Sequence, residues 1–312
     1  MTLDPVSLTP LPPREEAVES ALPEAEYLYQ PYSQPPSDLT HDLAQLDPPH
    51  LGHAILFFVL TVPMLFLGEA LSLFLAKQSH LFGNESYHAI FERLGTDARL
   101  AIPAQMLTYA LTALAAAAIF PVLWRQPFLQ GIHWNVSAAK TKFLWLLALG
   151  LALGFGITLL GNYLPMPKDP PIMQDMMGSP LGAWMMLLFG ITFAPLLEEL
   201  AFRGFLLPGL IHGLRWLMQR DILSPEAFSW MTLPLSVVLT TIPFALLHAT
   251  QVSHAWAPLL LIGIVSVALC VIRLRLKSVA ASAVVHAAYN FTLFAGLLLQ
   301  TDGFRHLDRL NS

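Results

Sequence analysis

Long runs of apolar residues alternate with shorter polar stretches from residue 51 to the end of the chain. Most of these runs approach or exceed the ~20 apolar residues that an α-helix needs to cross the hydrocarbon core of a bilayer. The pattern predicts an all-α fold, a polytopic membrane helix bundle of about seven to eight transmembrane helices. The predicted spans are 51–76, 100–124, 143–164, 181–211, 231–249, 256–271 and 279–299.

The polar segments divide the chain into four parts. Residues 1–50 are rich in Pro, Glu, Asp and Ser and cannot bury enough apolar surface to offset the entropy of ordering, so we expect a disordered, Pro-rich acidic tail. Residues 51–179 hold the N-terminal transmembrane helices and their connectors. Residues 180–300 form the core that carries the polar motifs described below, and residues 301–312 form a short C-terminal tail.

Three connectors between the predicted spans differ in composition. Residues 77–99 are partly amphipathic, which predicts an interfacial helix or loop. Residues 165–180 are rich in Pro and Met, which is compatible either with an interfacial connector or with a lid over a site. Residues 212–231 are polar enough to leave the membrane, and we expect them to join two spans outside it.

Composition narrows the class of protein. Of the 312 residues 12% are charged and 55% are hydrophobic, and the mean hydropathy is +0.58. A soluble domain carries roughly 25% charged residues, so this chain is expected in a lipid bilayer. The net charge of −5 comes largely from the N-terminal tail and indicates no nucleic-acid partner. The single cysteine, Cys270, cannot form an intramolecular disulfide, and no CxxC or His-rich metal-binding spacing is present.

Basic residues in short loops are enriched on the cytoplasmic side of membrane proteins. The connections after the second, fourth and sixth predicted spans are the more basic ones, although the first connection is an exception with Lys77, Arg93 and Arg99. This bias places the N-terminal tail in the cytoplasm. The basic residues that follow those three spans are Arg125, Lys140, Lys142, Arg215, Arg220, Arg273, Arg275 and Lys277.

Three ionisable residues, Glu198, Glu199 and Arg203, lie near the end of the apolar run that begins at Pro180. An ionisable side chain at the centre of a transmembrane helix costs about 2.5–3.5 kcal/mol on insertion scales, so a cluster of three indicates a function. Glu199 and Arg203 are spaced i,i+4 with the acid first, the favourable orientation for an ion pair. Glu198 points about 100° away around the helix and lacks that partner. We therefore predict one neutralised carboxylate beside one that is available for chemistry.

Three further polar residues, His248, His286 and Asn290, stand in later apolar runs. His286 and Asn290 are spaced i,i+4 and share a helix face. A carboxylate and a histidine can hold and deprotonate a water molecule, and a second histidine with an amide can donate hydrogen bonds to the oxyanion of an attacked carbonyl. Each residue alone also fits a plain polar contact between helices. Together they indicate hydrolysis of an acyl bond inside the membrane.

Three motifs follow one another: Glu-Glu-x-x-x-Arg at 198–203, Phe-x-x-x-His at 244–248 and His-x-x-x-Asn at 286–290. In their order and spacing, over about residues 180–300, the chain resembles the CAAX protease and bacteriocin-processing (CPBP or Abi) family, the prokaryotic relatives of the type II CAAX prenyl endopeptidases. The resemblance implies an all-α membrane bundle with a conical intramembrane cavity. It also implies a multi-pass protein of the cell membrane, the inner membrane of a prokaryote.

The resemblance assigns a role to each motif residue. Glu198 is implied to be the catalytic glutamate that activates water, and His248 to assist it. His286 and Asn290 are implied to form the oxyanion site. The remaining motif residues take supporting positions: Glu199, Arg203 and Phe244.

These observations predict an intramembrane endopeptidase that hydrolyses a peptide bond of a membrane-associated peptide or protein substrate. The alternative class is a non-proteolytic membrane scaffold or a bacteriocin-immunity-type protein. Two histidines and a glutamate are in principle zinc ligands. However, the chain has no HExxH-type pair at these positions and the amide of Asn290 is a poor zinc ligand. We therefore expect no metal and no other cofactor, with zinc as the minority alternative.

Overall fold

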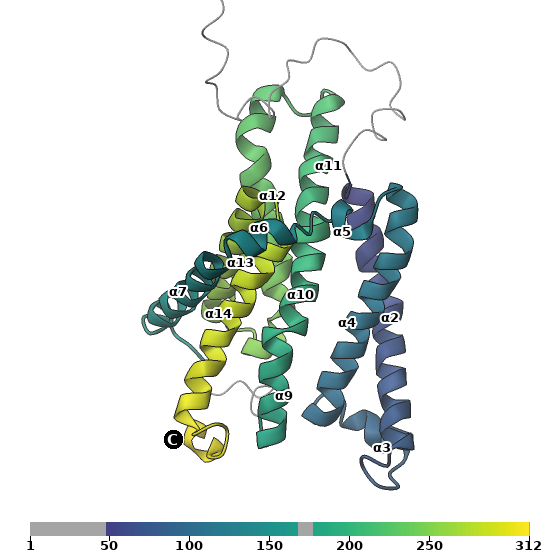
Figure 1. Ribbon diagram of the computed structural model, residues 1–312, viewed down its shortest axis with the longest axis vertical. Coiled ribbons are helices and arrows are strands. Elements are labelled where there is room, and N and C mark those ends of the chain that lie inside the picture. Colours follow the sequence, from purple (N-terminus) through teal and green to yellow (C-terminus); the bar gives the residue numbers. More distant parts are fainter. Residues whose placement is uncertain (1–47, 168–176, 312) are drawn as a thin grey trace, which may run out of the picture. The chain divides into compact units, whose positions relative to one another are not determined.

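The computed structural model describes residues 48–167 and 177–311. Within these ranges every regular element is a helix, and seven helical spans are long and apolar enough to cross a membrane. The predicted all-α polytopic bundle is therefore confirmed (Figure 1). The predicted N-terminal tail lies outside the described residues except for 48–50, and so does most of the 165–180 connector. Both interpretations stay predictions.

Six of the seven spans are single α-helices. They are α2 (Leu51–Gln78), α4 (Ala98–Trp124), α7 (Phe143–Gly161), α12 (Pro225–Leu247), α13 (Trp256–Leu276) and α14 (Val279–Gln300). Shorter helices lie between and after them: α3 (Tyr87–Glu92), α5 (Phe128–Gly131), α6 (Val136–Thr141) and the 3₁₀ turns η3 (Thr250–Val252) and η4 (Leu307–Asn311).

Short polar side chains begin several of these helices. Asp97 accepts a hydrogen bond from the backbone N–H of Arg99 at the start of α4. Ser224 and Ser278 each accept one from the N–H group three residues further on, at the starts of α12 and α14. These bonds satisfy backbone donors that the first turn of a helix leaves unpaired. The sequence thus marks where each of these spans begins.

The remaining span is a continuous helical path over Pro180–Gln219. It consists of α9 (Pro180–Ile191), α10 (Phe193–Glu199), the π-helical segment η2 (Leu200–Leu206) and α11 (Leu207–Gln219). Thr192, between α9 and α10, departs from helical geometry with φ −121° and ψ −79°. The path therefore changes its helical geometry twice before it reaches α11.

The prediction that residues 212–231 form one polar connection is wrong in its bounds. α11 stays helical to Gln219 and α12 begins at Pro225, so only residues 220–224 join them. The reason is that α11 is amphipathic. Leu207, Leu210, Leu214 and Leu217 recur at helical spacing, and the polar face of such a helix lowers its average hydropathy to that of a loop.

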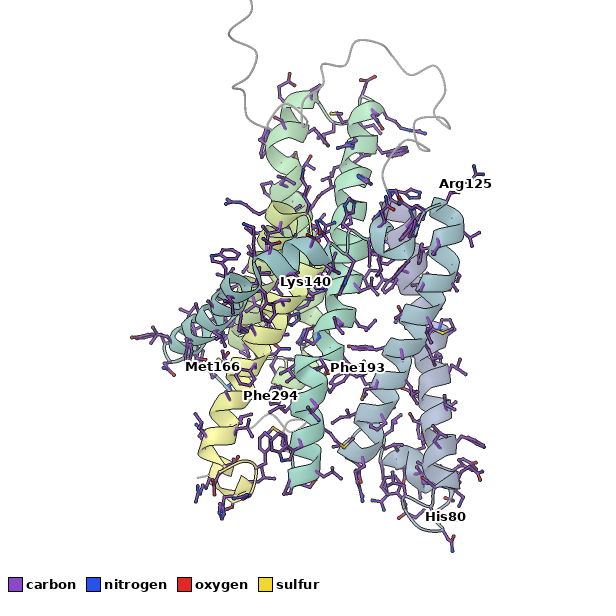
Figure 2. The ribbon with its side chains drawn as sticks, viewed as in Figure 1. His80, Arg125, Lys140, Met166, Phe193 and Phe294 are labelled. Atoms are coloured by element: carbon purple, nitrogen blue, oxygen red, sulfur yellow. The ribbon has the colours of Figure 1, made fainter. Side chains whose placement is uncertain are left out.

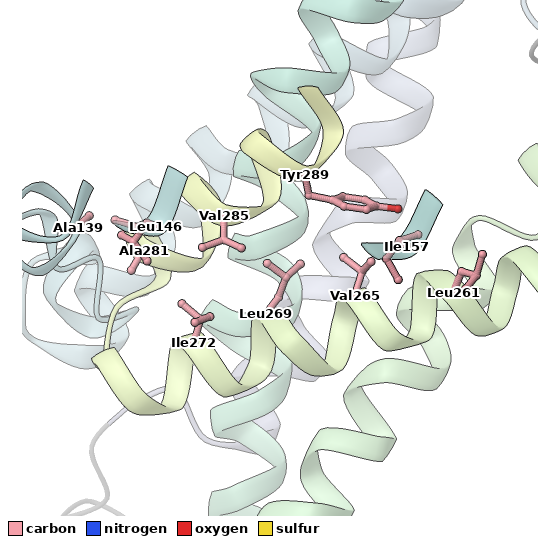
Figure 3. Packing of buried hydrophobic residues seen from close by; sticks show 11 residues of the cluster. Ala139, Leu146, Ile157, Leu261, Val265, Leu269, Ile272, Ala281, Val285 and Tyr289 are labelled. Carbon is pink, nitrogen blue, oxygen red and sulfur yellow. The ribbon is translucent and has the colours of Figure 1, made fainter. Parts of the chain in front are cut away.

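Small residues let α7 pack closely against α14. A Cβ atom on Gly150 would come within 2.5 Å of the Ala288 Cβ, and one on Gly154 would collide with the Thr292 hydroxyl. Close approach at small residues is a typical way to pack helices in a bilayer, where apolar burial gives little driving force. The contact adjoins an apolar cluster that these two helices share with α13, which includes Leu146, Val265, Leu269 and Val285 (Figure 3).

Aromatic rings hold the π-helical segment against its neighbours. The Phe205 ring stacks on Phe57 of α2 with centroids 4.4 Å apart and meets Phe120 of α4 at 4.6 Å. Phe202 meets Phe244 of α12 edge-on at 5.1 Å. Aromatic pairs contribute about 0.5–1.5 kcal/mol each beyond the area that they bury. The cluster therefore fixes the stretch of chain that carries the predicted site.

Candidate active site

The two glutamates lie where the helical path changes from α10, which begins at Phe193 (Figure 2), to the π-helical segment η2. A π-helical turn interrupts the regular ladder of backbone hydrogen bonds, and such turns are frequent at functional sites. Here a side chain of α13 reaches the interrupted backbone, because Arg273 Nε donates to the carbonyl oxygen of Arg203 at 3.2 Å. The irregular turn is thus tied to a neighbouring span.

Glu199 and Arg203 form an ion pair, with 3.0 Å between Glu199 Oε1 and Arg203 Nη1, and both side chains are fully buried. Arg203 Nη2 also donates to the carbonyl and the hydroxyl oxygen of Ser266 at 2.9 and 2.8 Å. The guanidinium carbon lies 4.5 Å from the ring centroid of Phe244. A buried charge needs this degree of compensation, because its desolvation is otherwise costly.

His286 joins this pair from α14, with its Nδ1 atom 3.0 Å from Glu199 Oε1. A carboxylate accepts hydrogen bonds, so Nδ1 carries the proton. His248, which ends α12, has its Nδ1 atom 2.8 Å from the carbonyl oxygen of Phe244, and the same reasoning places a proton there. In their neutral forms both imidazoles therefore present the lone pair of Nε2.

Both Nε2 atoms face Glu198. Its Oε2 atom lies 3.7 Å from His286 Nε2 and 3.9 Å from His248 Nε2. The side chain of Glu198 is 17% exposed, and its Oε2 atom is buried with no hydrogen-bond donor of the described residues in reach. These separations exceed a direct hydrogen bond and suit a water molecule that contacts all three groups.

The hydrogen-bonding roles of Glu198, His248 and His286 show that a proton must lie between them. Glu198 Oε2 and the two Nε2 atoms are all acceptors when the imidazoles are neutral and the carboxylate is ionised. Three converging acceptors need at least one proton between them, supplied by a water molecule or by protonation of one group. The arrangement is suited to taking up and passing on a proton.

Asn290, which is expected in the oxyanion site, also contacts the backbone of another helix. Its Nδ2 atom donates to the carbonyl oxygen of Gly190 at 2.7 Å. Gly190 lies in the last turn of α9, just before the irregular residue Thr192. One Nδ2 hydrogen of Asn290 is therefore used between α14 and α9, and the second remains for another acceptor.

Two residues near the site belong to none of the three sequence motifs. Tyr109 of α4 lies within electrostatic reach of Glu198 and hydrogen bonds to Gln105. Ser266 of α13 receives Arg203 and accepts a hydrogen bond from Thr241 at 3.2 Å. A tyrosine within an apolar run is a signal that sequence reasoning could have used. A serine in such a run is too common to stand out.

Glu198, His248 and His286 are residue types that can bind a metal. Among the described residues, no group of three or more His, Cys, Asp or Glu side chains is arranged to hold a metal ion. The amide of Asn290, the fourth member of the set, donates to a carbonyl instead. The expectation that the site uses no metal stays a prediction, and the chemistry proposed below uses none.

The fold and the site define a class: a multi-pass α-helical membrane protein in which spans distant in sequence bring a carboxylate and two imidazoles together. Residues 180–292 match the family described as type II CAAX prenyl endopeptidase Rce1-like. The match confirms the family that the three motifs indicated. That family consists of proteases, so the general class is a CAAX-type intramembrane protease. No curated protein and no solved structure gives a significant match.

Proposed function

We propose that the protein is an intramembrane endopeptidase of the glutamate type, which hydrolyses a peptide bond of a membrane-associated substrate. One observation carries the proposal: Glu198 Oε2 lies 3.7 and 3.9 Å from the Nε2 atoms of two histidines that come from other spans. The neighbouring carboxylate, Glu199, is occupied by Arg203 and His286. Among the described residues, Glu198 Oε2 has no direct hydrogen-bond partner.

In the proposed reaction, a water molecule lies between Glu198 and His248. Glu198 takes one of its protons as the oxygen attacks the carbonyl carbon of the scissile bond, and His248 holds the water through Nε2. The attack leaves a tetrahedral oxyanion. When the C–N bond breaks, the departing nitrogen receives the proton that Glu198 took, so both products leave neutral and Glu198 is again a carboxylate.

His286 and Asn290 are proposed as donors to the oxyanion. The second Nδ2 hydrogen of Asn290 is not used in its bond to Gly190. His286 can donate from Nε2 only as an imidazolium, because its Nδ1 hydrogen is directed at Glu199. The carboxylate of Glu199 would stabilise that imidazolium. Glu199 and Arg203 thus support the site through charge, and Phe244 supports it by packing on Arg203.

The substrate is proposed to be a peptide or protein that lies in or against the bilayer, because the site lies on membrane-spanning helices. We also propose the cell membrane, the inner membrane of a prokaryote, as the location. The N-terminal tail is proposed to lie in the cytoplasm, since the connections after the second, fourth and sixth spans are the more basic ones.

The test is the substitution Glu198→Gln, which keeps the shape of the side chain and removes the base. General-base catalysis contributes roughly 10²–10⁴-fold, so the rate should fall by at least a hundredfold while the protein still folds. Comparative membrane proteomics of wild type and variant identifies substrates, and the purified proteins are then assayed on one of them.

Glu69→Gln is the matched control, because Glu69 is a lone acid of α2 outside the site. A Glu198→Gln protein that cleaves at the wild-type rate would show the mechanism to be wrong, and an unchanged phenotype would favour a scaffold.

A further inference from the structure

A hollow of about 520 Å³ opens where α6, the start of α7 and the end of α13 meet. None of the candidate catalytic residues lines it. We call it the basic hollow. Its lining residues are Lys140, Thr141, Lys142, Phe143, Leu144, Trp145 and Leu276. Figure 2 marks Lys140 on this part of the chain, at some distance from Arg125.

Hydrogen bonds between distant parts of the sequence build the hollow. Ser278 Oγ donates to the carbonyl oxygen of Asn135 at 2.8 Å, and the N–H of Val279 donates to the carbonyl oxygen of His133 at 3.1 Å. These two bonds hold the segment that leads into α6 against the turn between α13 and α14. The hollow is therefore a fixed feature of the fold and not an opening between loosely placed loops.

The same two hydrogen bonds bring basic side chains of the two segments close together. Lys140 and Lys142 line the hollow from one segment, and Arg275 and Lys277 flank its lining residue Leu276 in the other. All four basic side chains are exposed. Four like charges on two adjoining segments produce a positive potential that attracts anions.

No acidic side chain offsets this charge within the described parts of the chain. Residues 98–167, 177–197 and 227–301 contain no Asp or Glu, and none of the ion pairs among the described residues involves these four basic side chains. Arg93 and Arg99, by contrast, are each paired with a carboxylate. Among the described residues, the positive charge at the basic hollow is therefore not neutralised by a carboxylate.

Three of the other lining residues are apolar and exposed. Phe143, Leu144 and Trp145 are 48%, 77% and 54% exposed at the start of α7. Aromatic residues at the ends of membrane spans sit at the level of the lipid headgroups. Basic pockets between spans at that level are suited to lipid phosphates. A free phosphate ion would use the lysines but would gain nothing from the three apolar side chains.

We propose that the basic hollow binds the headgroup of an anionic phospholipid. Its phosphate lies between Lys140 and Lys142, within the field of Arg275 and Lys277, and its acyl chains lie along Leu144 and Trp145. The proposal is independent of the catalytic assignment, because it uses none of the site residues. It predicts that the protein retains a specific anionic lipid when it is extracted from the membrane.

The experiment uses the full-length protein in zwitterionic detergent–phosphatidylcholine micelles, titrated with phosphatidylglycerol, with lipid occupancy read by native mass spectrometry. Each basic residue near an anionic lipid surface strengthens binding about fivefold, so Lys140→Ala with Lys142→Ala should weaken phosphatidylglycerol binding about thirtyfold. Arg125→Ala with Arg215→Ala removes the same charge outside the hollow and should change binding less than threefold. The melting temperature without anionic lipid should stay the same in both variants, since all four side chains lack ion-pair partners among the described residues.

Three results would overturn the proposal. Equal weakening in both double variants would show that the lipid responds to diffuse surface charge. Equal retention of phosphatidylcholine and phosphatidylglycerol by the wild type would show that the headgroup charge is not recognised. Displacement of the lipid by millimolar inorganic phosphate would identify a free-phosphate site. If the alanine variant fails to fold, Lys140→Gln with Lys142→Gln replaces it, with the same expected loss.

Discussion

Glu199 and Arg203 are both fully buried, so each is the main compensation for the charge of the other. Removing one partner of a buried ion pair typically costs ~3–5 kcal/mol, because the other charge is left unpaired. We expect Arg203→Ala to lower the free energy of unfolding by about that amount. Adding Glu199→Ala should recover part of the loss. Thermal unfolding in detergent measures both, with Arg125→Ala as the control at an exposed arginine. If the two substitutions lower the free energy of unfolding additively, the proposed pairing is wrong.

Asn290 can act in two ways, and the two have different kinetic signatures. An oxyanion donor contributes only in the transition state, and its removal typically lowers kcat by about 10²–10³-fold. We therefore expect Asn290→Ala to lower kcat a few hundredfold with little change in KM. Asn290→Asp is the matched control, because it keeps the size of the side chain and loses both N–H donors. A fall in melting temperature with kcat intact would instead limit Asn290 to its bond with Gly190.

At the scale of helices, the lengths of the apolar runs predicted the number and the type of the spans, because a transmembrane helix needs a long apolar run. Bounds were predicted less well where a helix is amphipathic, as in α11, since the average hydropathy of a window hides the apolar stripe. The π-helical geometry of η2 and the irregular Thr192 had no signal in the sequence. Both depend on packing by distant residues, such as the bond from Arg273 to the backbone of Arg203.

In the candidate site, too, contacts within one helix were predictable from the sequence and contacts between helices were not. The i,i+4 spacing predicted the contact between Glu199 and Arg203, because both residues lie on one helix and local geometry decides it. The approach of His248 and His286 to Glu198 joins three helices, so no spacing within one helix contains it. Only the order of the three motifs, as a family pattern, pointed to that convergence. The roles of these residues remain predictions until they are tested by substitution.

At the scale of the whole molecule, catalysis and lipid binding are proposed for separate places. The carboxylate–imidazole cluster lies among α10, α12 and α14, whereas the basic hollow lies at the junction of α6, α7 and α13. The cluster Leu146, Val265, Leu269 and Val285 packs α7, α13 and α14 together, so the elements around the two places share one apolar core (Figure 3). Neither Lys140 nor Lys142 belongs to this core, so substituting them should leave Glu198 and its histidines in place.

The metal requirement is a property of the intact, active protein, and zinc is the alternative that the residue types Glu198, His248 and His286 leave open. A catalytic zinc needs about three protein ligands and an open position, and no group among the described residues has that arrangement. We expect cleavage to survive exhaustive chelation, and elemental analysis of the active protein to find no stoichiometric zinc. Glu198→Gln protein serves as the control, since loss of a metal ligand would also lower any zinc content. Activity that a chelator abolishes and zinc alone restores would make Glu198 a ligand, or the base beside the metal.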